Sequence, residues 1–133
     1  METKNYTDIE QSKKLAKILP FESADMCWFV HADDEDFATK IAFVAGSAVH
    51  YAYEKITDWN DTPYIPAWSL AALLKLLPQK IEHEGNEAEL HINSRMTDLW
   101  YENDNFIYFS TFAKELIDAC VQLICTLNEK SVL

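Results

Sequence analysis

The chain has 133 residues, of which 49% are hydrophobic, 13% aromatic and 25% charged, and its formal net charge is −11. This length suits one domain with a sizeable core, and the composition excludes an intrinsically disordered chain. The chain has 22 acidic and 11 basic residues, and Arg95 is its one arginine. We therefore expect no direct nucleic-acid binding and no site for anionic membranes or phosphorylated ligands.

No apolar run approaches the roughly 18 residues of a membrane-spanning helix, and the first residues lack the basic-then-apolar pattern of a signal peptide. The three cysteines are Cys27, Cys120 and Cys125. An odd number, with members embedded in apolar patterns, favours reduced and buried thiols over a disulfide framework. We therefore predict a cytoplasmic protein without membrane association.

The first predicted element is a helix over residues 7–19. Thr7-Asp8-Ile9-Glu10 has the spacing of a capping box with Thr7 as the N-cap, and Pro20 ends the helix. Residues 1–17 carry a net charge of +1, which leaves −12 for the rest of the chain. A basic first helix can dock on the acidic body of its own chain or of a second copy, so a homodimer is one expectation.

Three strands are predicted next, over residues 24–31, 37–45 and 48–55. The first is apolar on both faces and the third alternates with a period of two, as central and half-buried strands do. Gly46-Ser47 is typical of a two-residue hairpin loop between the second and the third.

The most apolar stretch of the chain is Tyr64–Pro78, which predicts a central helix over residues 66–77. Between Pro66 and Pro78 only Ser69 and Lys75 are polar. A helix that is apolar nearly all round is a buried one. We therefore expect this helix to be shared by the strands before it and after it.

A polar bridge over residues 79–86 leads to strands predicted over residues 87–94, 97–102 and 106–110. The last predicted element is an amphipathic helix over residues 111–129, with Ser110 or Thr111 as its N-cap. The order α-βββ-α-βββ-α indicates a single α+β domain over residues 1–133. Its strands are mostly antiparallel, with helices packed on one face.

Three sequence landmarks occur in order along the chain: S-A-D-M (Ser23–Met26), I-P-A-W-S-L-A-A-L-L-K-L-L-P (Ile65–Pro78) and D-A-C-V (Asp118–Val121). As a set they resemble a family of small uncharacterised proteins of anaerobic gut bacteria and their prophages. The resemblance implies a shared fold and a mobile-element setting. It implies no activity and no functional residue.

Metal and catalytic patterns are missing from the sequence. The acidic run over residues 33–36 lacks the alternating spacing of a calcium loop, and no two of the four histidines have zinc-binding spacing. No serine, threonine or cysteine stands in a nucleophile motif, and Cys27 is expected to be a small core residue. We predict no metal, no cofactor and no catalytic residue, and we favour a protein that is not an enzyme.

Four aromatic residues form the candidate binding patch: Trp59, Tyr64, Trp68 and Trp100. Indole and phenol groups seek hydrogen-bond partners, and such rings either cover the end of a core or form a binding surface. Both alternatives remain open from the sequence.

The function predicted from these observations is that of a small acidic accessory protein of a prophage or mobile element, acting by protein contacts. One alternative is an acidic mimic of nucleic acid that inhibits a DNA-binding protein. The other is a small-molecule-binding protein or hydrolase that uses the aromatic patch.

Overall fold

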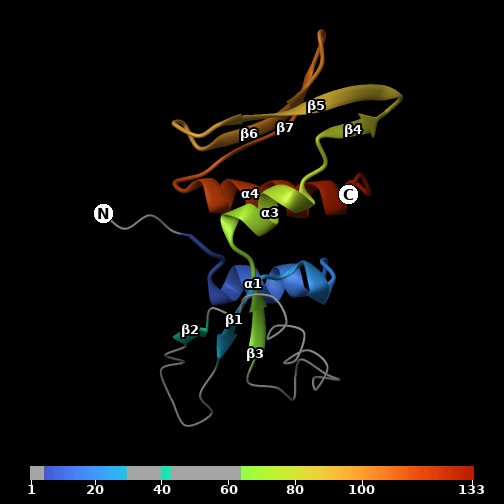
Figure 1. Cartoon of the computed structure of the whole chain (residues 1–133). Helices are drawn as coiled ribbons and strands as arrows, with labels where there is room; N and C mark the ends of the chain where they lie inside the picture. The colour runs from blue at the N-terminus through green and yellow to red at the C-terminus, as the bar shows by residue number, and fades with distance from the viewer. Residues whose placement is uncertain (1–4, 30–39, 43–63) are drawn as a thin grey trace. The chain divides into compact units, whose positions relative to one another are not determined.

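The computed structural model describes residues 5–29, 40–42 and 64–133. The chain folds into two compact units, Tyr6–Ala72 and Leu73–Leu133, the second of which also includes Met1–Asn5. The fold class is α+β, as predicted (Figure 1). The expectation of one domain over residues 1–133 stays a prediction.

The first unit contains helix α1 (Ile9–Ala16), a turn of 3-10 helix (Phe21–Ser23) and a three-stranded sheet. The strands are β1 (Met26–Phe29), β2 (Lys40–Ala42) and β3 (Tyr64–Ala67), in the order β2-β1-β3 with both pairs antiparallel. β1 and β2 confirm the cores of two predicted strands. The strand predicted over residues 48–55, like the Gly46-Ser47 loop and the acidic run over residues 33–36, lies outside the described residues.

Helix α1 begins later than predicted. Asp8, not Thr7, is the N-cap, and the capping box is closed by Gln11, whose backbone N–H donates to Asp8 Oδ1 at 2.8 Å. Glu10 therefore takes no part in the box. The Thr7 hydroxyl is buried instead, where it pairs with the Ser12 hydroxyl at 2.7 Å.

The central helix was predicted too long at its N-terminus. Residues Tyr64–Ala67 form β3, and helix α3 covers Leu70–Leu76. Pro66 is tolerated in β3 because β3 lies at the edge of the sheet that the described strands form, where a missing N–H costs little. The helix starts after Ser69 because its Oγ accepts a hydrogen bond from the Ala72 N–H, as an N-cap side chain does.

The leucines of α3 differ in burial. Leu73 is buried, and so is Leu77 just beyond the helix, whereas Leu70, Leu74 and Leu76 are only half-buried. The prediction of a helix buried nearly all round was therefore wrong in part.

A hydrogen-bond network holds the first unit together around Trp68, which is fully buried. Thr7 donates its N–H to the Trp68 carbonyl at 3.0 Å, and its Oγ1 accepts from the Trp68 N–H at 3.1 Å. The Trp68 indole donates to Ser23 Oγ at 3.0 Å. Asp25 receives both the N–H and the hydroxyl of Ser69. The segment before α1, the turn after it and the start of α3 are thus bonded to one another.

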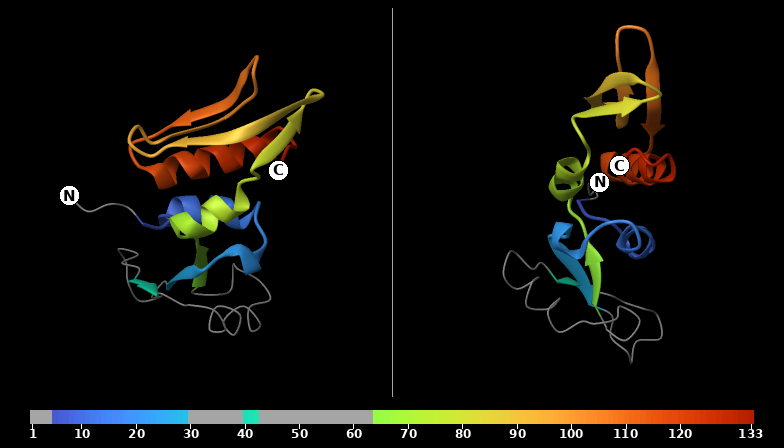
Figure 2. Two further views of the ribbon diagram at one scale, coloured as in Figure 1. Left: turned by 45° about the horizontal axis from the view of Figure 1, so that its top comes forward. Right: turned by 90° about the vertical axis from the view of Figure 1, so that its right-hand side faces the viewer.

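The second unit is a four-stranded antiparallel meander with helix α4 (Leu116–Glu129) against one face (Figure 2). Its strands are β4 (Lys80–His83), β5 (Asn86–Asn93), β6 (Asp98–Glu102) and β7 (Ile107–Phe112), in the order β4-β5-β6-β7. The last three confirm predicted strands, and one helix covers one face of this sheet, as expected.

β4 lies where a polar bridge was predicted. Its sequence K-I-E-H carries a single apolar residue, Ile81, which is 5% exposed and pairs with buried Ala88. Glu84 and Gly85 join β4 to β5 with φ angles of 52° and 82°. Two positive φ angles in a two-residue loop are the signature of a type I′ hairpin turn.

Helix α4 begins five residues later than predicted. β7 continues to Phe112, which pairs with Asp98, and the N-cap is Glu115 rather than Ser110 or Thr111. The predicted amphipathic helix is confirmed, since eight of its side chains are buried and the helix packs against β6 and β7. Among the helices that the structure describes, none combines the length and apolar character that crossing a bilayer requires.

The Thr7 network makes a specific prediction for stability. Thr7→Val leaves the Trp68 N–H and the Ser12 hydroxyl without their buried partner, which should lower the free energy of unfolding by ~1–3 kcal/mol. Urea unfolding followed by tryptophan fluorescence measures the change. The matched control is Thr126→Val. The Thr126 hydroxyl is partly exposed on α4 and donates to the Gln122 carbonyl, which water can hydrogen-bond once the hydroxyl is removed. Equal losses in the two variants would contradict the role given to Thr7.

The cysteines make a second prediction. All three are buried thiols outside any disulfide, as expected from the sequence, and burial raises the pKa of Cys120 from 9.0 to about 12. The folded state therefore holds this proton when the unfolded state has released it. The stability contribution is complete below pH 9.0 and is lost as the pH rises toward about 12.

Urea midpoints at about pH 8 and about pH 10.5 test this, with Cys120→Ala as the comparison. The wild-type chain should lose more stability between the two pH values than the variant, because both share every other alkaline titration. Identical losses would show that Cys120 ionisation does not contribute.

Candidate functional site

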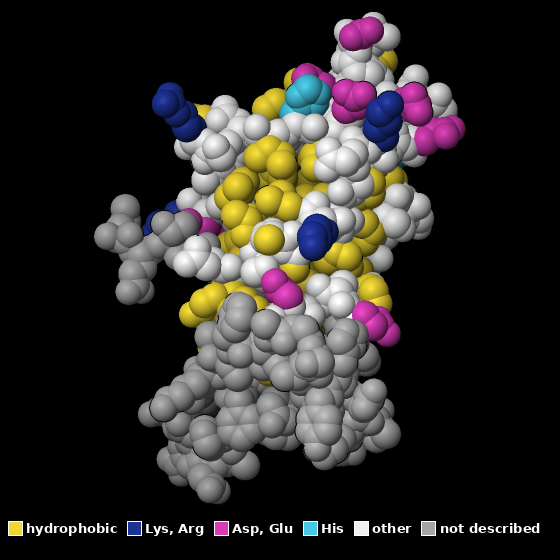
Figure 3. All heavy atoms as spheres, in the orientation of Figure 1, with side chains coloured by type: hydrophobic (Ala, Val, Ile, Leu, Met, Phe, Trp, Pro, Cys, Tyr) yellow, Lys and Arg dark blue, Asp and Glu magenta, His cyan; other side chains and the backbone are white. Residues whose placement is uncertain are grey.

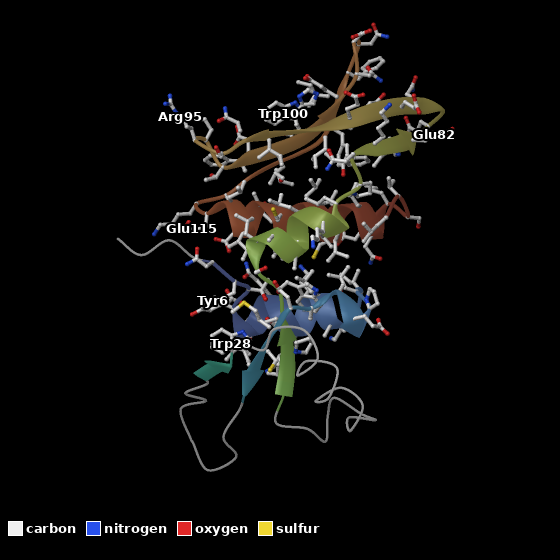
Figure 4. The ribbon with its side chains drawn as sticks, in the orientation of Figure 1. Tyr6, Trp28, Glu82, Arg95, Trp100 and Glu115 are labelled. Atoms are coloured by element: carbon white, nitrogen blue, oxygen red, sulfur yellow. The ribbon has the colours of Figure 1, made fainter. Side chains whose placement is uncertain are left out.

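The face of the β4–β7 sheet that turns away from α4 is the most distinctive surface of the second unit. Along β6, Leu99 and Tyr101 are fully buried, and Thr111, the partner of Leu99, hydrogen-bonds the α4 carbonyl of Ala119. Trp100 lies between them in sequence and therefore points to the opposite side, as Figure 4 shows. We call this side the open face.

Cross-strand partners share a face of a sheet, so the register gives the open face row by row. The rows are Glu82–Glu87, then Lys80–Glu89–Glu102–Ile107, then His91–Trp100, and last Asn93–Asp98–Phe112.

Two pairs of carboxylates lie directly opposite each other in these rows, Glu82 with Glu87 and Glu89 with Glu102. Like charges at such positions destabilise a sheet. Lys80 is the one cation in the rows, and its Nζ lies 3.7 Å from Glu89 Oε1, with both side chains about two-thirds exposed. Acidic side chains gather at the β4–β5 end of the sheet in Figure 3.

The third row places an aromatic stack at the centre of the open face. The rings of His91 and Trp100 are nearly parallel, at 12°, with centroids 5.7 Å apart. His91 Nε2 also lies 3.1 Å from Glu102 Oε1, which fixes the imidazole between a ring and a carboxylate. Trp100 Nε1 and Asp98 Oδ1 are buried beneath this face, and within the described part of the chain neither has a hydrogen-bond partner.

Apolar side chains occupy the β7 side of the open face. Ile107 is 65% exposed and Phe112 is 70% exposed. Five positions separate them, an odd number that would place them on opposite faces of a regular strand. They share a face because β7 contains a bulge: Phe109 and Ser110 together lie opposite Trp100, and the φ angle of Phe109 is 53°.

The bulge also limits what the outer edge of β7 can do. Within the described part of the second unit, β7 is an edge strand without a charged residue, which is a template for another strand. A bulge interrupts the row of backbone groups that a further strand would need. Contacts through the side chains of the open face are therefore favoured over strand addition at the edge.

A shallow hollow of about 560 Å³ lies on the charged half of the open face. Its wall includes Lys80, Glu89, His91 and Glu102, and it holds no serine, threonine or cysteine that could act as a nucleophile. The described residues contain no group of three or more histidine, cysteine or acidic side chains that could hold a metal ion. The hollow offers charge and an oriented imidazole, but neither the enclosure nor the apolar lining of a typical ligand pocket.

The four aromatic residues of the predicted patch are placed differently. Trp68 is fully buried in the first unit, where it acts in the core, and Trp100 lies half-buried on the open face of the second. Tyr64 belongs to β3, but its side chain is outside the description, and Trp59 lies outside the described residues. Trp28, not part of the predicted patch, packs edge-on against Tyr6 with centroids 5.6 Å apart.

Sequence reasoning did not assign Ile107, Phe112, Glu82 or Glu87 to a site. The strand predicted over residues 87–94 is confirmed as β5, and alternation along it places Glu89 and His91 on its polar side. Comparison with family models, with curated proteins and with solved structures finds no match to this chain.

The opposed carboxylates make a prediction that needs no partner. Glu87→Lys places an ammonium opposite Glu82 and should raise the free energy of unfolding by ~0.5 kcal/mol, because a repulsive cross-strand pair becomes attractive. Urea unfolding at low and at high salt measures the gain, which should shrink as salt screens the pair.

Glu22→Lys is the matched control, because this exposed residue lies outside the four-stranded sheet and changes the net charge equally. A gain of the same size in both variants would assign the effect to net charge alone.

Proposed function

We propose that this chain is a non-catalytic protein-binding module that docks a basic protein surface through its open face. The observation that supports it best is the composition of the uncovered rows. Two opposed carboxylate pairs stand beside exposed apolar side chains, and one lysine accompanies them. Such rows cost folding stability, so a binding role is a physical reason for their presence.

The apolar half of the open face would contribute affinity for a partner, and its acidic half would attract and orient that partner. Ile107 and Phe112 lose most contact with water only when a partner covers them, and each such burial contributes roughly 1.5–3 kcal/mol. Trp100 lies at the centre, where tryptophan is enriched among the residues that dominate binding energy. The carboxylates attract a basic partner and orient it, which raises the association rate more than the affinity.

The proposal fits the resemblance to small proteins of gut bacteria and their prophages. In this proposal the chain is an accessory protein that acts by contacting another protein, and its acidic rows would repel nucleic acid and anionic lipid. The mobile-element setting and the cytoplasmic location are part of this proposal.

The nucleic-acid mimic is a second candidate, favoured by one specific observation. The carboxylates of β4, β5 and β6 lie in adjacent rows on one face, as a surface that imitates phosphates requires. In that case the partner would be a DNA-binding protein, and DNA would compete for it. The small-molecule alternative is less well supported because its predicted aromatic patch includes Trp68, which is buried.

Photo-crosslinking tests the proposal. A benzophenone amino acid at Phe112, compared with one at Asn128 on α4, is activated in a native lysate of the producing cells. A protein crosslinked only from Phe112 is then purified and titrated with the chain. Ile107→Ser/Phe112→Ser should weaken its binding at least about ten-fold, or ~1.4 kcal/mol, with stability changed by less than ~0.5 kcal/mol because both side chains are exposed.

Met96→Ser/Leu133→Ser is the control, since it removes two exposed apolar residues outside the rows. Equal affinity for the wild-type chain and the open-face variant, or the same crosslinked protein from both positions, would reject the proposal. Displacement of the chain by duplex DNA would identify the partner as a DNA-binding protein.

A further inference from the structure

We infer that the basic side of α1 of a second copy of this chain docks on the open face, so that the chain associates with itself. The inference rests on the proposed function in taking the open face as the docking surface. It adds that a second copy of the chain binds there, in competition with any other partner of the same rows.

The exposed side of α1 is a compact cationic surface. Lys13, Lys14 and Lys17 are all exposed, and the structure gives none of them an ion pair with a described residue. Lys13 and Lys17 are four positions apart, so they lie on the same side of the helix, about 6 Å apart along its axis. Leu15 and Ser12 face inward and are buried.

The acidic rows have a matching repeat. Glu87 and Glu89 lie on the same side of β5, two residues and therefore ~6.7 Å apart along the strand. Each stands opposite a second carboxylate, Glu82 or Glu102. A helix lying along β5 can thus bring successive lysines against successive carboxylate pairs, and each new contact also relieves a repulsive pair.

The sequence places the two surfaces on different parts of one chain, since residues 1–17 carry +1 and the remaining residues −12. Self-association is therefore electrostatically complementary although every copy has a net charge of −11. Contacts between exposed charges are weak and screened by salt, so the dissociation constant should rise at least about ten-fold between low and high ionic strength.

Sedimentation velocity on the purified full chain tests the inference with two charge-reversed variants. Lys13→Glu/Lys14→Glu/Lys17→Glu makes both surfaces acidic, and Glu82→Lys/Glu87→Lys/Glu89→Lys makes both basic. Each variant alone should be monomeric at concentrations where the wild-type chain associates. Their equimolar mixture should associate again, because the acidic helix of one fits the basic rows of the other.

General attraction cannot explain recovery in the mixture. Each variant changes the net charge of −11 by six units, to −17 and to −5, so the two still repel each other at long range. The matched control is Glu10→Lys/Glu22→Lys/Glu129→Lys, which reverses three exposed acids outside the open face and also has a net charge of −5. It keeps an acidic open face and a basic α1, to which Glu10→Lys adds a further positive charge, so on its own it should associate at least as tightly as the wild-type chain. Loss of its association would assign the behaviour of the open-face variant to net charge alone.

A wild-type chain that stays monomeric at low salt would overturn the inference. So would an α1-reversed or open-face-reversed variant that associates like the wild type, or an equimolar mixture of those two that stays monomeric. A monomeric chain that still binds a crosslinked partner through Phe112 would overturn this inference alone. A chain that associates as described but yields no such partner would overturn the wider proposed function.

Discussion

The first unit depends on one buried threonine. Thr7 uses its N–H and its hydroxyl for the backbone of Trp68, and the same hydroxyl pairs with Ser12 in α1. The Thr7 carbonyl accepts a hydrogen bond from the indole N–H of Trp28 at 3.0 Å, so β1 is also bonded to Thr7. A polar residue with no exposed surface is tolerated only when its groups are bonded, and here those bonds join four segments.

The second unit shows the opposite balance. Its buried side follows the rules of stable sheets, with Leu99 and Tyr101 packed toward α4 and the Tyr101 hydroxyl bonded to the Pro78 carbonyl at 2.7 Å. Its open face breaks those rules twice, by opposing Glu82 to Glu87 and Glu89 to Glu102. Natural chains keep such departures from local stability mainly where they bind something. The two sides of this sheet therefore differ in how closely they follow the rules for stable sheets.

The sequence was most informative where periodicity was long. It predicted α4 and the strands β5, β6 and β7, because apolar residues recur there at regular spacing. It missed β4, because the single apolar residue Ile81 gives no period. It also extended the central helix to Pro66, because a proline before an apolar run is typical of a helix start, whereas Pro66 belongs to β3. Of the two members of the predicted patch whose side chains the structure describes, Trp100 lies in the candidate site and Trp68 does not. Ile107 and Phe112 were beyond reach because strict alternation assigns them to opposite faces.

The bulge at Phe109 and Ser110 means that one residue of chain length decides which side chains the open face displays. A homologous protein with a single deletion at this point could keep β6, β7 and α4 in place, yet either Ile107 or Phe112 would turn inward. Two such proteins would look almost identical by residue identity and would differ in what they bind. In related sequences, an insertion or deletion in β7 would therefore change the open face more than a substitution would.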